Sequence, residues 1–472
     1  MKSLIRKVYV AIWSGFLKMT EDRPAVRRII LSLFEGDPLS RLRRDPKKST
    51  NRYSRALQYR GIPLLDVSQF KPKRILILNA SLAAGGAERQ IVNTMIGLKE
   101  RGFDDMLLLC DRLSSDGNFN FYQSKLKSEG IASRERANYS QRRTANNHET
   151  LITALEGVLR NCPGFLKEEI KSYATEILEI RPWVVHAWQD ATSVKAGLAA
   201  ALVGVPRIIL SGRSMAPYHF NYYLPYFKPI YEALAMRQNV QLLNNSNAGA
   251  RDYQGWLGHT ENPIGVVFNG IAQATPARSA QREMTKNEGF SERSETDLVV
   301  GTIMRFHEEK DPILWVRVAA AVSEAVPEAR FLMVGEGPLR DRTLGLSRDL
   351  GLGGRISIRE PTDKPEKAFA EMNVFLLSSR LEGTSNVCIE AQLLGVPVVA
   401  PDVGGIEDTI LSGKTGWIVE QRTVAALAER VIASLRDAGW RRNAAVEAPN
   451  FVRSRFGLQR MISETIQYYA LD

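Results

Sequence analysis

Short apolar runs alternate with helical patterns along this chain, and the alternation occurs in two separate series. Such runs are typical of parallel strands that are buried on both faces. The first series has runs at 74–79, 106–110, 183–186 and 207–210, with helical patterns at 87–101, 151–180 and 196–203. The second series has runs at 298–304, 330–334, 355–358, 374–378 and 398–400, with helical patterns near 312–325, 338–350, 364–371 and 386–394. Because only a crossover connection returns a chain to pair in parallel, each series predicts a doubly wound parallel sheet.

A polar segment separates the two series. Residues 272–297 are rich in Gln, Thr, Ser, Arg, Glu and Lys and contain few large apolar residues, which is linker composition. We therefore expect an α/β protein of two Rossmann-like domains, 61–271 and 298–455, that face each other across a cleft. An arm of residues 1–60 precedes them, and we expect residues 456–472 to form a C-terminal helix that packs back on the first domain.

The positive charge of the chain is concentrated in this arm. The net charge is +11, and residues 1–60 contribute +10 through 15 Lys/Arg against 5 Asp/Glu, which leaves +1 for the rest. A nucleic-acid-binding protein would instead carry basic residues across a folded face. We therefore expect no nucleic-acid partner, although that class stays open as a less favoured alternative.

The arm also has an amphipathic pattern. Ile5, Val8, Ile12 and Phe16 recur at helical spacing, with most of the basic residues elsewhere on the helical wheel, as in helices that lie on anionic membranes. The apolar stretch Val8–Leu17 is about half the roughly 20 residues that are needed to span a bilayer. The arm therefore predicts peripheral binding to an anionic membrane, and the alternative is a solvated helix packed on the body of the protein.

The cysteines support neither a disulfide framework nor a zinc site. Cys110, Cys162 and Cys388 are scattered, and the chain has no CxxC pair. This usage fits a reducing cytosol.

Candidate ligand-binding residues follow the predicted strands, where open parallel sheets bind their ligands. Gly85 and Gly86 open the first helix, so that backbone amides and the helix dipole can meet an anion. Arg305 and Lys310 follow the first strand of the second series, and two cations there suit a diphosphate. The alternatives are a tight turn for the glycines and a surface pair for the two cations.

The segment 378–407 combines residues that can bind phosphate with residues that can bind sugar hydroxyls. Glu382 lies on a loop after a strand, and Glu390 lies on the following helix. The residues at the start of that helix can receive phosphate oxygens, while the two carboxylates can accept hydrogen bonds from sugar hydroxyls. These helix-start residues are Gly383, Thr384, Ser385 and Asn386.

This segment resembles the signature EGxxxxxxEAxxxGxPV of the family-4 retaining glycosyltransferases of the GT-B fold. The matching residues are Glu382, Gly383, Glu390, Ala391, Gly395, Pro397 and Val398. Other stretches agree in order, namely 85–89, Arg305 with Lys310, 335–338, 404–407 and 413–416. The resemblance, which covers about residues 72–472, implies that Glu390 binds the nucleotide ribose, that Arg305 and Lys310 hold the diphosphate, and that Glu382 contacts the transferred sugar.

The chain departs from the family pattern near His186. Family members carry a histidine shortly after the tryptophan that corresponds to Trp188, and here Gln189, Asp190 and Ala191 stand there. We include His186 among the candidate catalytic residues. The alternative is a structural histidine at a strand end.

The resemblance implies a retaining hexosyltransferase that uses a UDP- or GDP-linked sugar and a glycan acceptor. The arm and the habit of the family suggest that the acceptor is lipid-linked and belongs to bacterial surface polysaccharide synthesis. We expect a cytoplasmic protein, peripheral on the inner face of the membrane. Because no DxD triplet occurs, we expect no metal and no cofactor. The alternative is a sugar-nucleotide epimerase or a phosphorylase of the same architecture.

Overall fold

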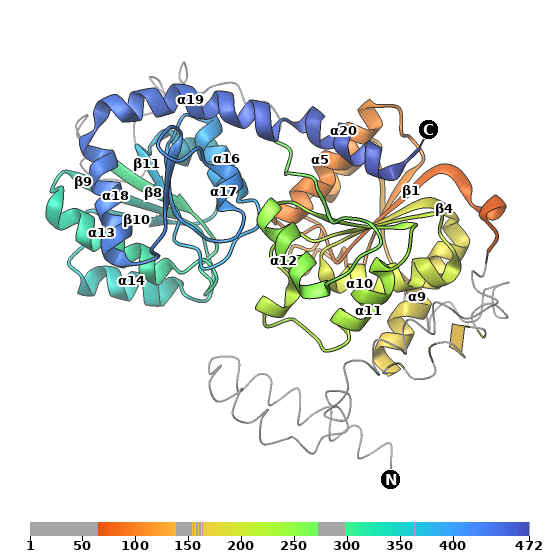
Figure 1. The fold of residues 1–472 in the computed structure, drawn as a ribbon. Coiled ribbons are helices and arrows are strands. Elements are labelled where there is room, and N and C mark those ends of the chain that lie inside the picture. Colours follow the sequence, from red (N-terminus) through yellow and green to blue (C-terminus); the bar gives the residue numbers. More distant parts are fainter. Residues whose placement is uncertain are drawn as a thin grey trace, which may run out of the picture. The chain divides into compact units, whose positions relative to one another are not determined.

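The computed structural model describes residues 65–137, 164–271, 298–362 and 364–471, together with a few single positions between 153 and 162. The arm 1–60 and the linker 272–297 lie outside the described residues, so the predictions about them stay predictions. Two parallel sheets with helices on both faces organise the described chain (Figure 1). The predicted fold class is therefore confirmed.

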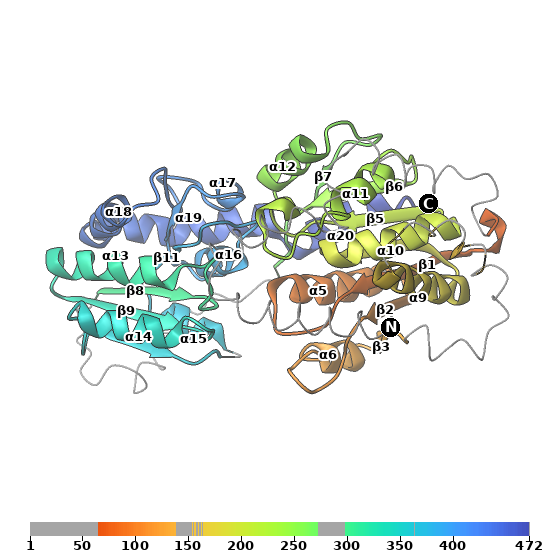
Figure 2. The ribbon, with the colours of Figure 1, turned by 90° about the horizontal axis from the view of Figure 1, so that it is seen from below.

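The first sheet has seven strands, which pair in parallel in the order β3-β2-β1-β4-β5-β6-β7. Their bounds are β1 Lys71–Asn79, β2 Met106–Cys110, β3 Ala132–Glu135, β4 Pro182–Trp188, β5 Arg207–Ser211, β6 Val240–Asn244 and β7 Gly265–Val266. The connecting helices are α5 Gly86–Glu100, α6 Gln123–Ser128, α9 Gly164–Ile180, α10 Asp190–Val203, α11 Phe227–Ala235 and α12 Asn247–Leu257, with short 3₁₀ turns η1 Val67–Gln69 and η2 Pro217–His219. Figure 2 shows α6 beside β2 and β3 at one edge and α12 at the other.

The second sheet has six parallel strands in the order β10-β9-β8-β11-β12-β13. Their bounds are β8 Leu298–Ile303, β9 Ala329–Val334, β10 Ile356–Arg359, β11 Val374–Leu376, β12 Val398–Pro401 and β13 Gly416–Val419. The helices are α13 Pro312–Ala325, α14 Arg340–Asp349, α15 Pro365–Ala370, α16 Asn386–Leu393, α17 Ile406–Thr409, α18 Val424–Arg436, α19 Ala438–Phe456 and α20 Leu458–Tyr469.

The continuous apolar runs are explained by burial on both faces. In β9, Phe331 and Met333 belong to the core that α13 and α18 cover, whereas Leu332 and Val334 belong to the core on the other face, beside α15 and α16. Since side chains alternate along a strand, both sets must be apolar.

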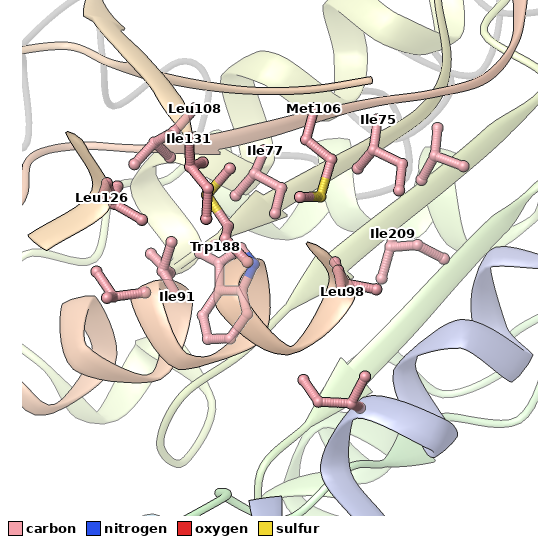
Figure 3. Packing of buried hydrophobic residues seen from close by; sticks show 14 of the residues in the cluster. Ile75, Ile77, Ile91, Leu98, Met106, Leu108, Leu126, Ile131, Trp188 and Ile209 are labelled. Atoms are coloured by element: carbon pink, nitrogen blue, oxygen red, sulfur yellow. The ribbon is translucent and has the colours of Figure 1, made fainter. Parts of the chain in front are cut away.

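The last helix, α20, packs on the first domain. Met461, Ile462 and Tyr469 join the core that β1 and α5 build, and Figure 3 shows part of this core, with Ile91 and Leu98 of α5 near Trp188. The helix approaches α5 closely, because a Cβ placed on Gly97 would lie 2.4 Å from Ile462 Cγ1. In the part of the chain that the model covers, no helix combines the length and the apolar character that crossing a membrane requires.

The contact at Gly97 makes a stability prediction. Gly97→Val should lower the free energy of unfolding of the first domain by about 1–3 kcal/mol, because the side chain must displace Ile462. Gly345→Ala is the matched control, since Gly345 lies in α14 with open space around its Cα, and it should raise stability by about 0.5–1 kcal/mol. Urea unfolding of both variants checks this. A Gly97→Val protein with an unchanged midpoint would contradict the close packing of α5 and α20.

Candidate functional site

The start of α5 meets the start of α16. α5 begins at Gly86 after an extended Gly85, and the Asn386 amide donates a hydrogen bond of 3.3 Å to the Gly86 carbonyl. A Cβ on Gly86 would lie 2.7 Å from Asn386 Nδ2, so a larger residue would displace the Asn386 side chain from this contact. The structure thus brings together two sets of predicted residues that are 300 positions apart.

Amide side chains extend this contact. Asn386 Oδ1 accepts hydrogen bonds from Asn269 Nδ2 at 2.7 Å and from Gln90 Nε2 at 3.4 Å. Gln90 Oε1 in turn accepts from the backbone N–H of Gly270 at 2.8 Å. The turn Asn269-Gly270 therefore fastens the first residue of α16 to α5.

Glu390 lies one turn further along α16 and forms an ion pair with Arg89 of α5. Its side chain is 14% exposed. Burial raises the pKa of Glu390, and the charge of Arg89 and its hydrogen bond oppose that shift. Arg89, Asn386 and Glu390 line a hollow of about 280 Å³.

Lys310 and Glu382, which we predicted as separate contacts, form one ion pair. Lys310 Nζ donates to Glu382 Oε1 at 2.6 Å, and Ser379 Oγ donates to the same oxygen at 2.6 Å. The side chain of Glu382 is only 8% exposed and that of Lys310 is 21% exposed. The pair is therefore held in place while the lysine still reaches solvent.

Arg305 lies on the same loop but is 68% exposed, and it pairs with Glu309 at 3.2 Å. The turn at Gly335 supports its backbone: Phe306 N–H donates to Glu336 O at 2.8 Å. Gly335 has a φ of +152°, and a Cβ there would lie 1.8 Å from Met304 O. Only glycine therefore allows the turn to pack this closely against the loop after β8.

The remaining predicted residues connect the loop after β11 to the first domain. Thr384 donates its hydroxyl to the Asn245 carbonyl, so this hydroxyl is already engaged. Ser385 is the N-cap residue of α16, but its side chain leaves the first amides uncapped. A Cβ on Gly383 would lie 2.8 Å from Arg213 O. The amides at this helix start therefore offer the more direct donors for an anion.

His186 is buried in β4 with both ring nitrogens hydrogen-bonded. Nδ1 bonds the Tyr469 hydroxyl at 2.8 Å and Nε2 bonds Ser211 Oγ at 2.7 Å. Burial, together with the charge of Arg213, lowers the pKa of His186 to about 3. This geometry favours the structural role over the catalytic one.

Comparisons with known proteins agree with the architecture. Residues 283–450 match the model of the family "Glycosyl transferases group 1". The chain is 28% identical over 422 residues to the Vi polysaccharide biosynthesis protein VipC/TviE of Salmonella typhi, which covers 84% of this chain and 71% of that protein. Residues 283–450 are therefore similar to group 1 glycosyltransferases, and the architecture of the chain is that of the GT-B fold.

Solved structures share the fold of this chain. Anabaena HepE in complex with UDP and glucose superposes with a TM-score of 0.64 at 17% identity, covering 84% of this chain and 98% of that one. TarM superposes with a TM-score of 0.64 at 14% identity, covering 86% and 100%. At such identities the likeness shows the fold alone.

Reasoning from the sequence missed several residues of the candidate site. We assigned no role to Arg89, which pairs with Glu390, or to Ser379, which bonds Glu382. Arg213 was missed although it follows β5 by two positions, as Arg305 follows β8. This shared position after a strand could have identified Arg213 from the sequence. No comparable pattern marks Arg89 as the partner of Glu390.

The buried His186 predicts a pH effect on stability. The folded protein keeps the ring neutral, whereas an unfolded histidine takes up a proton below about pH 6.5. Since the unfolded state then binds more protons, stability falls as the pH falls from about 6.5 towards 3, by about 1.4 kcal/mol per unit. His186→Gln lacks this contribution. Urea unfolding of both proteins at several pH values should show their stability difference shrinking below about pH 6.5. Parallel pH profiles would contradict the neutral buried ring.

Proposed function

We propose that this protein is a glycosyltransferase that moves a hexosyl unit from a nucleotide diphosphate sugar to a glycan acceptor with retention of the anomeric configuration. The observation that carries the proposal is the Lys310–Glu382 ion pair beside the uncapped start of α16. This arrangement places a cation and free amides for phosphate next to a buried carboxylate for sugar hydroxyls.

The diphosphate binds to Lys310, Arg305 and the helix starts. The ammonium of Lys310 is fixed by Glu382, while the exposed guanidinium of Arg305 can exchange Glu309 for a phosphate. Charge builds on the leaving phosphate as the sugar departs, and these cations stabilise it. They supply the positive charge that a metal ion would otherwise provide, so we propose a metal-independent reaction without a cofactor.

Glu390 binds the ribose of a UDP- or GDP-linked donor. Arg89 donates to Oε1 of Glu390. The second carboxylate oxygen, Oε2, has no hydrogen bond within the described residues. A carboxylate accepts several hydrogen bonds, so Glu390 can hold Arg89 and a ribose hydroxyl together.

Glu382 acts as a hydrogen-bond acceptor for the transferred sugar and not as a covalent nucleophile. Lys310 and Ser379 both donate to one of its oxygens, which lowers its nucleophilicity and fixes its orientation. In the step that we propose, the bond from the anomeric carbon to the phosphate oxygen breaks and the acceptor oxygen bonds to the same face. The acceptor proton passes to the leaving phosphate. The resemblance to the retaining family supports this stereochemistry.

The acceptor is a glycan of bacterial surface polysaccharide synthesis, which the relative named for Vi polysaccharide biosynthesis supports. The amphipathic arm supports a lipid-linked acceptor and a location on the inner face of the cytoplasmic membrane. An epimerase or a phosphorylase would release a different product, so product analysis separates those alternatives.

Replacing the cations tests the proposal. Arg305→Ala and Lys310→Ala should each lower kcat by about 100-fold or more, because both groups act on charge that develops in the transition state. Arg348→Ala is the control, since Arg348 is exposed on α14 in the same domain, and its kcat should not change. Release of nucleoside diphosphate from a donor panel gives the rates, and circular dichroism checks the folding. Wild-type turnover in both cation variants would remove them from the site.

A further inference from the structure

Three neighbouring strands of the first sheet end in polar groups that the proposed reaction does not use. Trp188 is the last residue of β4, Arg213 follows β5 by two positions, and Asn245 directly follows β6. Because β4, β5 and β6 pair side by side in parallel, these residues lie at the same edge of the sheet. That edge adjoins Gly383: a Cβ there would lie 2.8 Å from Arg213 O and 2.8 Å from Asn245 Oδ1.

The three side chains also contact one another or a shared group. The Arg213 guanidinium stacks on the Trp188 ring, with Cζ 4.4 Å from the ring centroid. Arg213 Nη2 donates to Asn269 Oδ1, and Asn245 Nδ2 donates to the same oxygen at 3.5 Å. Arg213 is thus held in one orientation at the edge where the two domains meet.

Each of these residues keeps a buried polar atom without a hydrogen-bond partner in the described chain. The atoms are the donors Arg213 Nε and Trp188 Nε1 and the acceptor Asn245 Oδ1. An unpaired polar group that is shielded from water is costly, so three such atoms together indicate a binding site for a polar group.

The charge of Arg213 indicates which kind of polar group binds at this site. Within the described residues, no carboxylate forms an ion pair with Arg213. Burial lowers the pKa of Arg213 to about 9, and the charge of Glu88 opposes that shift. Glu88 is itself bonded by Gln189 Nε2 at 2.9 Å. A cation that is poorly solvated and flanked by a second N–H donor is complementary to an oxyanion.

We propose that Arg213 and Trp188 bind an oxyanion carried by the acceptor glycan, either the carboxylate of a uronic acid or a phosphate group, while Asn245 Oδ1 accepts a hydrogen bond from a neighbouring hydroxyl of the same glycan. The inference rests on the proposed function, which gives the donor diphosphate its own cations, Arg305 and Lys310. An acidic glycan is therefore the substrate class of this glycosyltransferase.

Binding of simple probes tests the proposal without the unknown acceptor. Saturation-transfer NMR with the full chain compares D-glucuronate with D-glucose, and inorganic phosphate competes in a separate arm. Glucuronate should bind and glucose should not. Displacement of glucuronate by phosphate at equal concentration assigns the site to phosphate-bearing acceptors, and weak displacement assigns it to uronic acids.

Three variants connect the signal to Arg213. Arg213→Gln should weaken glucuronate binding about tenfold or more, and Arg213→Lys should weaken it less. Asn245→Asp keeps Arg213 but places a carboxylate beside it, and it should abolish binding in a folded protein. Arg348→Gln on α14 is the control and should bind as the wild type does.

Calorimetry with UDP and GDP separates this inference from the proposed function. Arg213→Gln should bind the nucleotide as tightly as the wild type. If it loses nucleotide binding instead, Arg213 belongs to the donor site and the inference is overturned. The inference is also overturned if wild type and Asn245→Asp bind glucuronate equally. If the wild type binds neither nucleotide, the proposed function fails, while the glucuronate result still decides the role of Arg213.

Discussion

Parallel pairing in both sheets places the candidate functional groups of this protein, because every strand then ends at the same edge as its neighbours. The ends of β1, β4, β5 and β6 and the loops after them supply the glycines, Trp188, Arg213 and Asn245 from the first sheet. The loops after β8 and β11 supply Lys310 and Glu382 from the second. A helix follows most of these loops, so backbone amides are presented at the same edge.

Two kinds of contact connect the domains, and they differ in chemistry. α20 buries Met461 and Ile462 against α5, and each apolar side chain contributes about 1.5–3 kcal/mol. The contacts at the site are polar instead, such as Asn386 with Asn269 and Gly86, and a neutral hydrogen bond contributes only about 0.5–1.5 kcal/mol. Stability therefore comes mainly from a region that no substrate needs to enter, and the site keeps hydrogen-bonding groups for its ligands.

The sequence predicted those elements whose local signals agree with their tertiary environment. α13 has the predicted bounds 312–325 because Asp311 caps its first turn, accepting from Leu314 N–H at 3.1 Å, and Pro312 begins it. β3 (Ala132–Glu135) was missed because this edge strand is polar. β6 was missed because Gln241 and Asn244 interrupt its apolar character, although all five of its residues are buried.

The role of a site residue could be predicted where a sequence motif implies it. It could not be predicted where the role depends on contact with a residue from a distant part of the chain. Lys310, Glu382, Asn386 and Glu390 were predicted from their positions after strands and from the resemblance to a family signature, but neither says that Lys310 and Glu382 share an ion pair. His186 shows the reverse case. The resemblance placed it among the candidate catalytic residues, whereas Tyr469, 283 residues away, occupies one of its ring nitrogens. Such pairings arise only when the chain has folded.

We propose that one donor nucleotide spans the residues that these loops bring together, and a crystal structure of the full chain with UDP or GDP would test this. We expect the diphosphate to contact Lys310, Arg305 and the amides at the start of α16, and a ribose hydroxyl to donate to Glu390. A nucleotide bound elsewhere, with Lys310 and Glu390 contacting only protein groups, would contradict it.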